Sequence, residues 1–259
     1  MPNLRQFANS FILALLFFCL ACQSKGQPSG VNTKPPTHQA WTELLQLYVD
    51  DKGFVDYKGF KNDKKRLENY LNTLSNNAPD PKRWSKPEQL AYWINAYNAY
   101  TVKLIVDNYP VESIQDLHPT LKVPGVNTVW HKKFFSIGGQ QSSLDEIEHQ
   151  ILRKNFNEAR IHFAINCASF SCPLLRNEAY TAEQLEQQLS EQTRLFINDP
   201  SRNKISPNEL ELSKIFSWFK GDFTKEGSLI DFLNTYSKTK IKEDADVDFM
   251  DYNWDLNEQ

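Results

Sequence analysis

The strongest constraint on the fold is one stretch, residues 85–106, which predicts a long helix with apolar side chains on nearly every face. It opens with Ser85-Lys-Pro-Glu88, where a serine, an early proline and a glutamate three residues after the serine form a capping box. A helix that is apolar all round must be surrounded by the rest of the chain, so we expect it at the centre of the core. Asn95 and Asn98 share one face of this helix. Because a buried amide needs hydrogen-bond partners, these side chains either hold a neighbouring loop or line a site.

The remaining secondary-structure signals predict a helix-rich α+β fold. Capping residues and apolar spacing predict shorter helices at 41–49, 64–74, 144–154, 181–197, 215–219 and 228–236. Strands are expected at 132–139, 161–165, 204–212 (as a hairpin) and 247–257. These strands do not alternate regularly with helices. We therefore predict a single α+β domain with a long buried central helix and a small, mainly antiparallel sheet.

The first 22 residues predict an export signal. Arg5 is the one charge before about ten apolar residues, too few to span a bilayer but typical of a signal-peptide core. The run ends in Leu20-Ala-Cys-Gln23, which resembles a bacterial lipobox and predicts lipid attachment at Cys22. A plain secretory signal cut elsewhere, or an uncleaved anchor, is the alternative. Residues 23–37 are rich in Gly, Pro, Ser and Thr, typical of a flexible tether, so the folded domain is expected over 38–259.

These features predict a protein of the bacterial cell envelope, held to the membrane by its N-terminal lipid. Gln23-Ser24 lacks the Asp after Cys that is associated with inner-membrane retention, which favours the outer membrane, facing the periplasm. The net charge of −3, without a basic cluster, argues against nucleic-acid binding. No cofactor is indicated, since Gly138-Gly139 is too short for a phosphate loop. The sequence does not identify a protein or small-molecule partner.

Residues 160–173 hold the densest group of reactive side chains, including His162, Asn166, Cys167 and Cys172. Once a signal peptide is removed and Cys22 is blocked by lipid, Cys167 and Cys172 are the two thiols left. In an oxidising compartment they could form a disulfide that closes a short loop. A redox-active pair is a further reading, although the spacing is not Cys-x-x-Cys. A metal site built with His149 and His162 has little support, because Cys-x₄-Cys without a second pair is not the usual zinc spacing.

The alternative is that Cys167 is a catalytic nucleophile, which requires a base within hydrogen-bond reach. If residues 161–165 are a strand, His162 and Asn166 face one side and Cys167 the other. His149, from another element, is then the better candidate base, with Arg153 on the same helix face.

An amide could orient such a base, as in Cys-His-Asn arrangements, and Asn166, Asn95 and Asn98 are the candidates. The three other histidines lie in segments expected to be tether or loop and are predicted to be solvated: His38, His118 and His131.

Four ordered motifs together resemble the DUF547 family, an uncharacterised domain family. They are Leu90-Ala-Tyr-Trp-Ile-Asn-Ala-Tyr-Asn-Ala99, Ser143-Leu-Asp-Glu-Ile-Glu-His149, His162-Phe-Ala-Ile-Asn-Cys-Ala-Ser-Phe-Ser-Cys-Pro173 and Tyr252-Asn-Trp-Asp-Leu-Asn257. The family usually shows Asn-Cys-Gly-Ala where this chain has Asn166-Cys-Ala-Ser169, and Cys-Pro-Pro where it has Cys172-Pro-Leu174. The resemblance implies a fold and a residue pattern, not a reaction.

Two classes of function therefore stay open. One is a non-catalytic envelope lipoprotein whose motifs build a buried polar network for structure or binding. The other is a cysteine-dependent hydrolase or acyl transferase that uses Cys167 with a histidine base.

Overall fold

The computed structural model describes residues 34–121 and 127–259. The predicted signal peptide with Cys22, and most of the predicted tether, lie outside the described residues. Within the described part, the predicted helix-rich α+β fold is confirmed. No helix of the described residues is both long enough and apolar enough to cross a bilayer.

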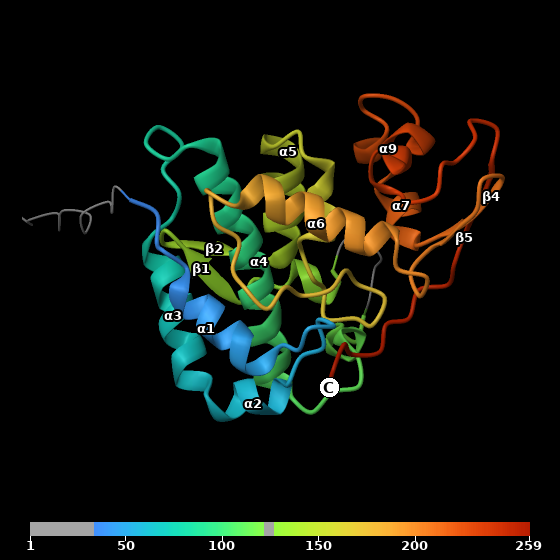
Figure 1. The fold of residues 1–259 in the computed structure, drawn as a ribbon. Coiled ribbons are helices and arrows are strands. Elements are labelled where there is room, and N and C mark those ends of the chain that lie inside the picture. Colours follow the sequence, from blue (N-terminus) through green and yellow to red (C-terminus); the bar gives the residue numbers. More distant parts are fainter. Residues whose placement is uncertain (1–33, 122–126) are drawn as a thin grey trace, which may run out of the picture. The chain divides into compact units, whose positions relative to one another are not determined.

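The central helix α4 (Lys86–Asn108) lies in the middle of the fold, as predicted (Figure 1). The Ser85 side chain accepts a hydrogen bond from the Glu88 backbone N–H, and the Glu88 carboxylate accepts one from the Ser85 backbone N–H. The predicted capping box is therefore confirmed. Most residues of α4 are buried, and the helix packs against α2, α3 and η3. The other elements in residues 34–121 are α1 (Gln39–Tyr48), α2 (Tyr57–Asn62), α3 (Lys64–Asn76) and the short helix η1 (Ile114–Leu117).

His38, just before α1, corrects one prediction. Its side chain is buried and not solvated, and its Nδ1 lies 2.7 Å from the Tyr70 hydroxyl of α3. Burial lowers the pKa of His38 to about 4, so the imidazole is neutral and packs as part of the core. The buried His38 ring thus connects the start of α1 to α3 through Tyr70.

Two small sheets complete the α+β fold. β1 (Phe135–Ile137) and β2 (Gln140–Ser142) form an antiparallel hairpin that turns at Gly138 and Gly139, both in the left-handed region. β3 (Lys204–Ile205) and β4 (Glu209–Leu212) form the predicted second hairpin. β5 (Asp246–Phe249) is shorter than the predicted late strand and adds to β4 in parallel.

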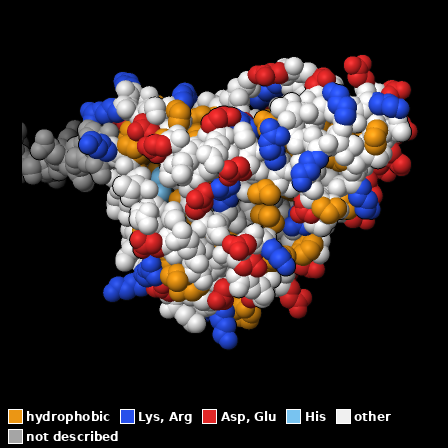
Figure 2. Space-filling view, viewed as in Figure 1, with side chains coloured by type: hydrophobic (Ala, Val, Ile, Leu, Met, Phe, Trp, Pro, Cys, Tyr) orange, Lys and Arg blue, Asp and Glu red, His pale blue; other side chains and the backbone are white. Residues whose placement is uncertain are grey.

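The helices of the second half are η2 (Val129–His131), η3 (Glu146–Leu152), α5 (Arg153–Asn155), η4 (Ala159–Phe163), α6 (Leu185–Ile197), α7 (Lys214–Trp218), α8 (Lys220–Phe223) and α9 (Leu229–Tyr236). The helix predicted at 144–154 begins with the expected Ser143–Glu146 capping box, but η3 has the wider turns of a π-helix. α7, α8 and α9 share a second apolar cluster with Phe163 and Phe196. Acidic and basic side chains are interspersed over the face seen in Figure 2.

The strand predicted at 161–165 is wrong: this stretch lies in the 3₁₀ helix η4 and the turn that follows it. The prediction that His162 and Asn166 face one side of a strand and Cys167 the other is therefore wrong as well. A short apolar run does not by itself distinguish a strand from a buried helical turn. Here the backbone bonds to α4 and not to a neighbouring strand, because Asn98 bonds to both Ala164 and Asn166.

Candidate functional site

A cavity of about 500 Å³ lies between the core around α4 and the second apolar cluster, and four of the predicted site residues line it: His149, His162, Cys167 and Cys172. Its walls come from α4, η2, η3, η4, α7 and the C-terminal segment. The histidines and acids that line it are His131, Asp145, Glu148, His149 and His162. Cys167 and Cys172 line the same space.

The π-helix η3 and its N-cap residue Asp145 supply three of the five acids and histidines that line the cavity. In a regular α-helix, consecutive residues are about 100° apart, so Glu148, His149 and Gln150 would spread over more than half the circumference. In η3 these three residues and Asp145 all line the cavity. π-Turns are rare and occur frequently at functional sites, which makes this segment the local feature that shapes the site.

Glu148 is the most strongly perturbed acid in the cavity. Its Oε2 accepts a hydrogen bond from the Tyr97 hydroxyl of α4 at 3.3 Å. Burial raises the pKa of Glu148 to about 7, while the Tyr97 hydrogen bond and the charge of Arg153 lower it; Asp145 and Asp222 raise it. A carboxyl that titrates near neutrality can give or take a proton there, which is the property that general acid–base groups need.

Both ring nitrogens of His149 face charged neighbours. The Arg153 guanidinium donates to its Nδ1 at 2.8 Å, and its Nε2 faces Asp145 at 3.7 Å. Burial lowers its pKa, so the ring is neutral with its proton on Nε2, and its accepting nitrogen is already used. Asp145 also lies 3.4 Å from His131 Nε2, so His131 belongs to the cavity wall and is half-buried, not solvated as predicted.

His162 forms a second acid–imidazole pair, with Asp222 of α8. Its Nε2 lies 2.8 Å from Asp222 Oδ2, which also accepts from Arg153 at 2.6 Å. These contacts hold the pKa of Asp222 well below its usual range, so the carboxylate is ionised and His162 donates through Nε2. Its Nδ1 is buried without a hydrogen-bond partner among the described residues, and the ring stacks on Phe219 at 3.9 Å. The free imidazole nitrogen of the site therefore belongs to His162, not to His149.

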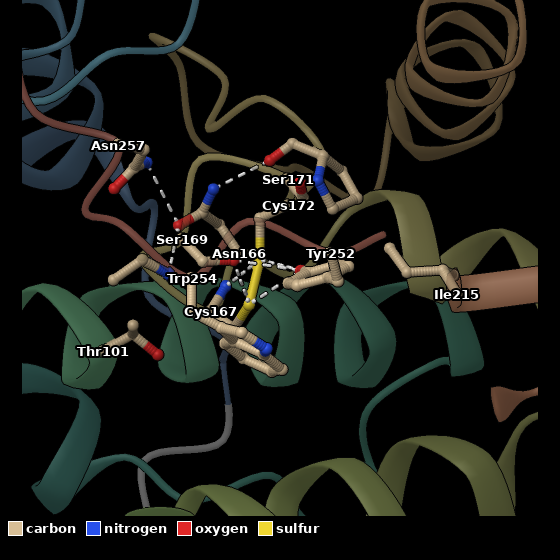
Figure 3. The surroundings of a disulfide bond; sticks show 12 residues. Thr101, Asn166, Cys167, Ser169, Ser171, Cys172, Ile215, Tyr252, Trp254 and Asn257 are labelled. Carbon is tan, nitrogen blue, oxygen red and sulfur yellow. Dashed lines mark hydrogen bonds between the residues drawn. A yellow bond between two sulfur atoms is a disulfide. The ribbon is translucent and has the colours of Figure 1, made fainter. Parts of the chain in front are cut away.

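Cys167 and Cys172 form a disulfide across one side of the cavity (Figure 3). Cys167 is half-buried, whereas Cys172 is 4% exposed. The Tyr252 hydroxyl lies 3.4 Å from the sulfur of Cys167 and 3.3 Å from that of Cys172, and it accepts a hydrogen bond from Ser169. No histidine appears among the hydrogen-bond partners of Cys167 in the described part of the chain.

The disulfide loop is joined to the C-terminal segment. Phe170 and Ser171 donate backbone hydrogen bonds to the carbonyls of Asp255 and Asn253. Ser169 and Leu256 form an isolated antiparallel bridge in the same region. The segment that carries Tyr252 and Trp254 is thus fixed directly on the loop that contains the cysteines.

Aromatic rings form the part of the cavity wall next to the disulfide. Trp218 and Trp254 stack with centroids 5.8 Å apart, Tyr252 lies 4.5 Å from Trp254, and Trp130 lies 5.6 Å from Trp254. Trp218 is 48% exposed, which is unusual for the largest apolar side chain. Sequence reasoning placed Trp218 only on an amphipathic helix and did not connect it with Trp254, because the two belong to separate elements that only the fold brings together.

Asn95 and Asn98 are buried behind the cavity and do not line it. Each amide bonds to both polar groups of a loop backbone. Asn95 donates to the Tyr180 carbonyl and accepts from its N–H at 2.8 and 3.0 Å. Asn98 donates to the Ala164 carbonyl at 2.9 Å and accepts from the Asn166 N–H at 2.8 Å.

Asn166 is also turned away from the cavity. Its side chain donates to the Pro173 carbonyl at 2.7 Å and accepts from the Ala168 N–H at 2.8 Å, which ties together the two ends of the disulfide loop. The three amides offered as orienting groups therefore contact backbone and no histidine. Among the described residues, no group of three or more His, Cys, Asp or Glu is arranged to hold a metal ion.

Several site residues were missed from the sequence: Glu148, Asp145, Asp222, Trp218 and Tyr252. The spacing of Glu146, Glu148 and Arg153 is typical of a salt-bridged helix face, but η3 turns Glu148 inward against Tyr97. The Glu-His pair within the Ser143 motif was the one sequence signal that could have found it.

Residues 81–197 match the model of a protein family described as "Protein of unknown function, DUF547". This finding supports the resemblance inferred from the four motifs. The matched stretch contains α4, η3 and the disulfide loop, but it ends before Trp218, Tyr252 and Trp254 of the aromatic wall. No match was found among curated proteins, and none among solved structures.

Proposed function

We propose that this DUF547-like chain is a cell-envelope lipoprotein whose domain binds a ligand in the aromatic-walled cavity without reacting with it. The observation that carries the proposal is that two unlike kinds of side chain line one cavity. Large aromatic rings line it together with the carboxyl and imidazole groups of His131, Asp145, Glu148 and His149. A largely apolar cavity with a few convergent polar groups is the usual form of a small-molecule site.

The combination of aromatic and polar lining residues favours a saccharide-like ligand. The CH-rich face of a sugar ring presents apolar surface that can pack on Trp218, Trp254 and Tyr252. Its hydroxyl groups can donate to Asp145 and Glu148, which line the same cavity. Covering the exposed half of Trp218 would also remove apolar surface from water, which supplies binding free energy.

Tryptophan fluorescence tests this proposal directly, because three of the six tryptophans of the chain line the cavity: Trp130, Trp218 and Trp254. We expect titration with chitotetraose to change the emission in a saturable way. Trp218→Ala should weaken binding at least about tenfold, as removal of a central aromatic anchor commonly does. The matched control is Leu195→Ala, since Leu195 is exposed to a similar degree on α6 and does not line the cavity. An unchanged spectrum with this and other oligosaccharide probes would count against a saccharide ligand.

The membrane part of the proposal rests on the sequence alone. The apolar run before Cys22 and the tether after it predict a lipid anchor that leaves the domain free of the bilayer. Cys22→Ser should move the protein from the membrane to the soluble fraction, measured by fractionation and immunoblotting. Ser24→Ala is the matched control and should leave the protein in the membrane fraction. Continued membrane association of Cys22→Ser would refute lipidation at this residue.

A cysteine-dependent hydrolase or acyl transferase is the second candidate, because Cys167, His149 and His162 line one cavity. The disulfide occupies the Cys167 sulfur, so such an enzyme would need to be reduced first. Hydrolysis of a thioester probe that appears only after reduction, and disappears in Cys167→Ser, would favour this candidate. Equal rates with and without reductant would exclude it.

A further inference from the structure

The cavity disulfide is surrounded by hydrogen-bond donors that a purely structural cross-link does not need. The backbone N–H of Cys167 lies 2.9 Å from the Cys172 sulfur. Ser169 donates to the Tyr252 oxygen at 3.0 Å, which leaves the Tyr252 proton free to point at either sulfur. Disulfide sulfur is a weak acceptor, but a thiolate is an anion that accepts such bonds strongly. Burial raises the pKa of Tyr252, so it keeps this proton.

A buried cation lies on the other side of the loop. Arg202 is 6% exposed, its Nε donates to the Cys172 carbonyl at 3.2 Å, and its guanidinium stacks over Phe170 at 5.0 Å. Within the described ranges, no carboxylate lies at ion-pair distance from it. A guanidinium stays charged even when buried, so its field favours an anion that forms on a nearby sulfur.

The two sulfurs also differ in access. Cys167 is half-buried, whereas Cys172 is nearly inaccessible. This asymmetry suits attack on the Cys167 sulfur from the cavity. The Cys172 sulfur would then be the leaving group, next to the hydrogen-bond donors.

We propose that Cys167–Cys172 is a redox-active disulfide that exchanges with low-molecular-mass thiols entering the cavity. The thiolate of the substrate attacks the Cys167 sulfur and forms a mixed disulfide. The bond between the two protein sulfurs breaks, and its electron pair goes to Cys172, where the Cys167 N–H and the Tyr252 hydroxyl stabilise the thiolate.

A second substrate thiolate then attacks the sulfur of the bound substrate and releases Cys167. In total, two thiols become one disulfide and the protein disulfide becomes a dithiol, with the two substrate protons ending on Cys167 and Cys172. The cavity volume of about 500 Å³ limits the substrate to a small thiol or a short cysteine peptide.

This inference goes beyond the proposed ligand binding and does not depend on it. Saccharide binding is measured without reductant, so either proposal can fail while the other stands.

The decisive measurement is reduction of the folded protein by excess reduced glutathione, followed by alkylation and mass spectrometry. We expect both cysteines to become alkylated without denaturant, through an intermediate that carries one glutathione on Cys167. A disulfide that resists glutathione in the folded protein and reacts only after unfolding would overturn the proposal.

Single variants test the direction of attack and the role of the tyrosine. Cys172→Ser should form a mixed disulfide with oxidised glutathione at least about tenfold faster than Cys167→Ser, because Cys172 is buried. Tyr252→Phe should slow reduction by about tenfold, the effect of one hydrogen bond to the leaving thiolate. Tyr236→Phe is the matched control, since Tyr236 lies on α9 outside the cavity. Equal labelling of the two cysteine variants would contradict attack at Cys167, and an unchanged rate in Tyr252→Phe would contradict its role. If a variant fails to fold, the reaction of the native chain still decides.

Discussion

The polar groups buried in α4 and those that face the cavity differ in how fully they are paired. Asn95 and Asn98 each satisfy a backbone donor and a backbone acceptor of a neighbouring loop. Across the cavity, Glu148 has a pKa raised to about 7, and His162 keeps a ring nitrogen without a partner in the described structure. The amides of α4 therefore stabilise the fold, whereas burial of Glu148 in its ionised form costs folding free energy.

The comparison separates structure from function in physical terms. A buried amide whose oxygen and NH₂ group are both hydrogen-bonded to backbone stabilises one arrangement of the chain. Its oxygen and NH₂ group are then already paired and are not left for a ligand. A buried acid with a raised pKa lowers the free energy of unfolding at high pH, because its ionised form is poorly solvated. Such perturbed groups cluster at functional sites. The following variants test whether the two groups differ in this way.

The largest expected effect is on stability, from Asn98→Leu. Leucine leaves the Ala164 carbonyl and the Asn166 N–H buried without partners. Two such groups together should lower the free energy of unfolding by about 3–4 kcal/mol, measured by urea denaturation. Asn72→Leu, at an exposed position of α3, is the control and should change stability by less than about 0.5 kcal/mol. A loss as small as the control's would mean that Asn98 does not hold the loop.

Glu148→Gln should have a smaller effect with a characteristic pH dependence. The pKa of Glu148 is 4.5 in its ordinary state and about 7 in the fold. As pH rises from about 4.5 to about 7, the unfolded chain loses this proton while the folded chain keeps it. The native protein therefore loses stability over this window, by at most about 3 kcal/mol. Glutamine cannot ionise, so the free energy of unfolding of the variant should rise relative to that of the native protein. The relative gain between pH 4.5 and pH 8 should be about 1–3 kcal/mol.

The control for this measurement is Glu146→Gln on the same helix. The hydrogen bond from Lys133 lowers the pKa of Glu146, so its stabilising contribution is present above the unfolded pKa and is lost as pH falls. Its pH dependence should have the opposite sign and be smaller, since this pair is exposed to solvent. The same sign in both variants would show that the effect of Glu148→Gln does not come from its raised pKa.

Removal of the disulfide tests whether the loop needs its cross-link as well as its amide. The Cys167→Ala/Cys172→Ala double variant should lose about 2 kcal/mol of stability, since the bond closes a short loop. Dithiothreitol should destabilise the native protein to a similar extent and leave the double variant unchanged, as followed by urea denaturation. A shift of the double variant by reductant would point to an effect unrelated to these cysteines.

The sequence predicted the elements that local chemistry decides. The capping boxes at Ser85 and Ser143 each begin a helical segment, and the hairpin at 204–212 is in place. These signals depend on residues a few positions apart, so they do not need the rest of the fold.

The cavity depends on contacts that sequence spacing does not encode. The run 161–165 has the composition of a strand, but Asn98 from α4 replaces the strand partner. Glu148 turns inward because η3 takes the wider π-turn, which an α-helical wheel does not foresee. Tyr252 reaches the disulfide from 80 residues along the chain, after the C-terminal segment pairs with the loop.

The smallest expected effect is that of Ala168→Gly, in the middle of the disulfide loop. Ala168 adopts φ +63°, a left-handed conformation that costs a residue with a Cβ about 1–2 kcal/mol. Glycine removes this strain but adds about 0.4–1 kcal/mol of unfolded-chain entropy, so the variant should be more stable by less than about 1 kcal/mol. The DUF547 family, which this chain resembles, usually has glycine at this position, as a positive φ favours. Ala164→Gly is the control: its φ is −102°, so the same change there should only destabilise, as measured by urea denaturation. Equal losses at both positions would show that the loop holds Ala168 without strain, and that Asn166 and the disulfide alone define its shape.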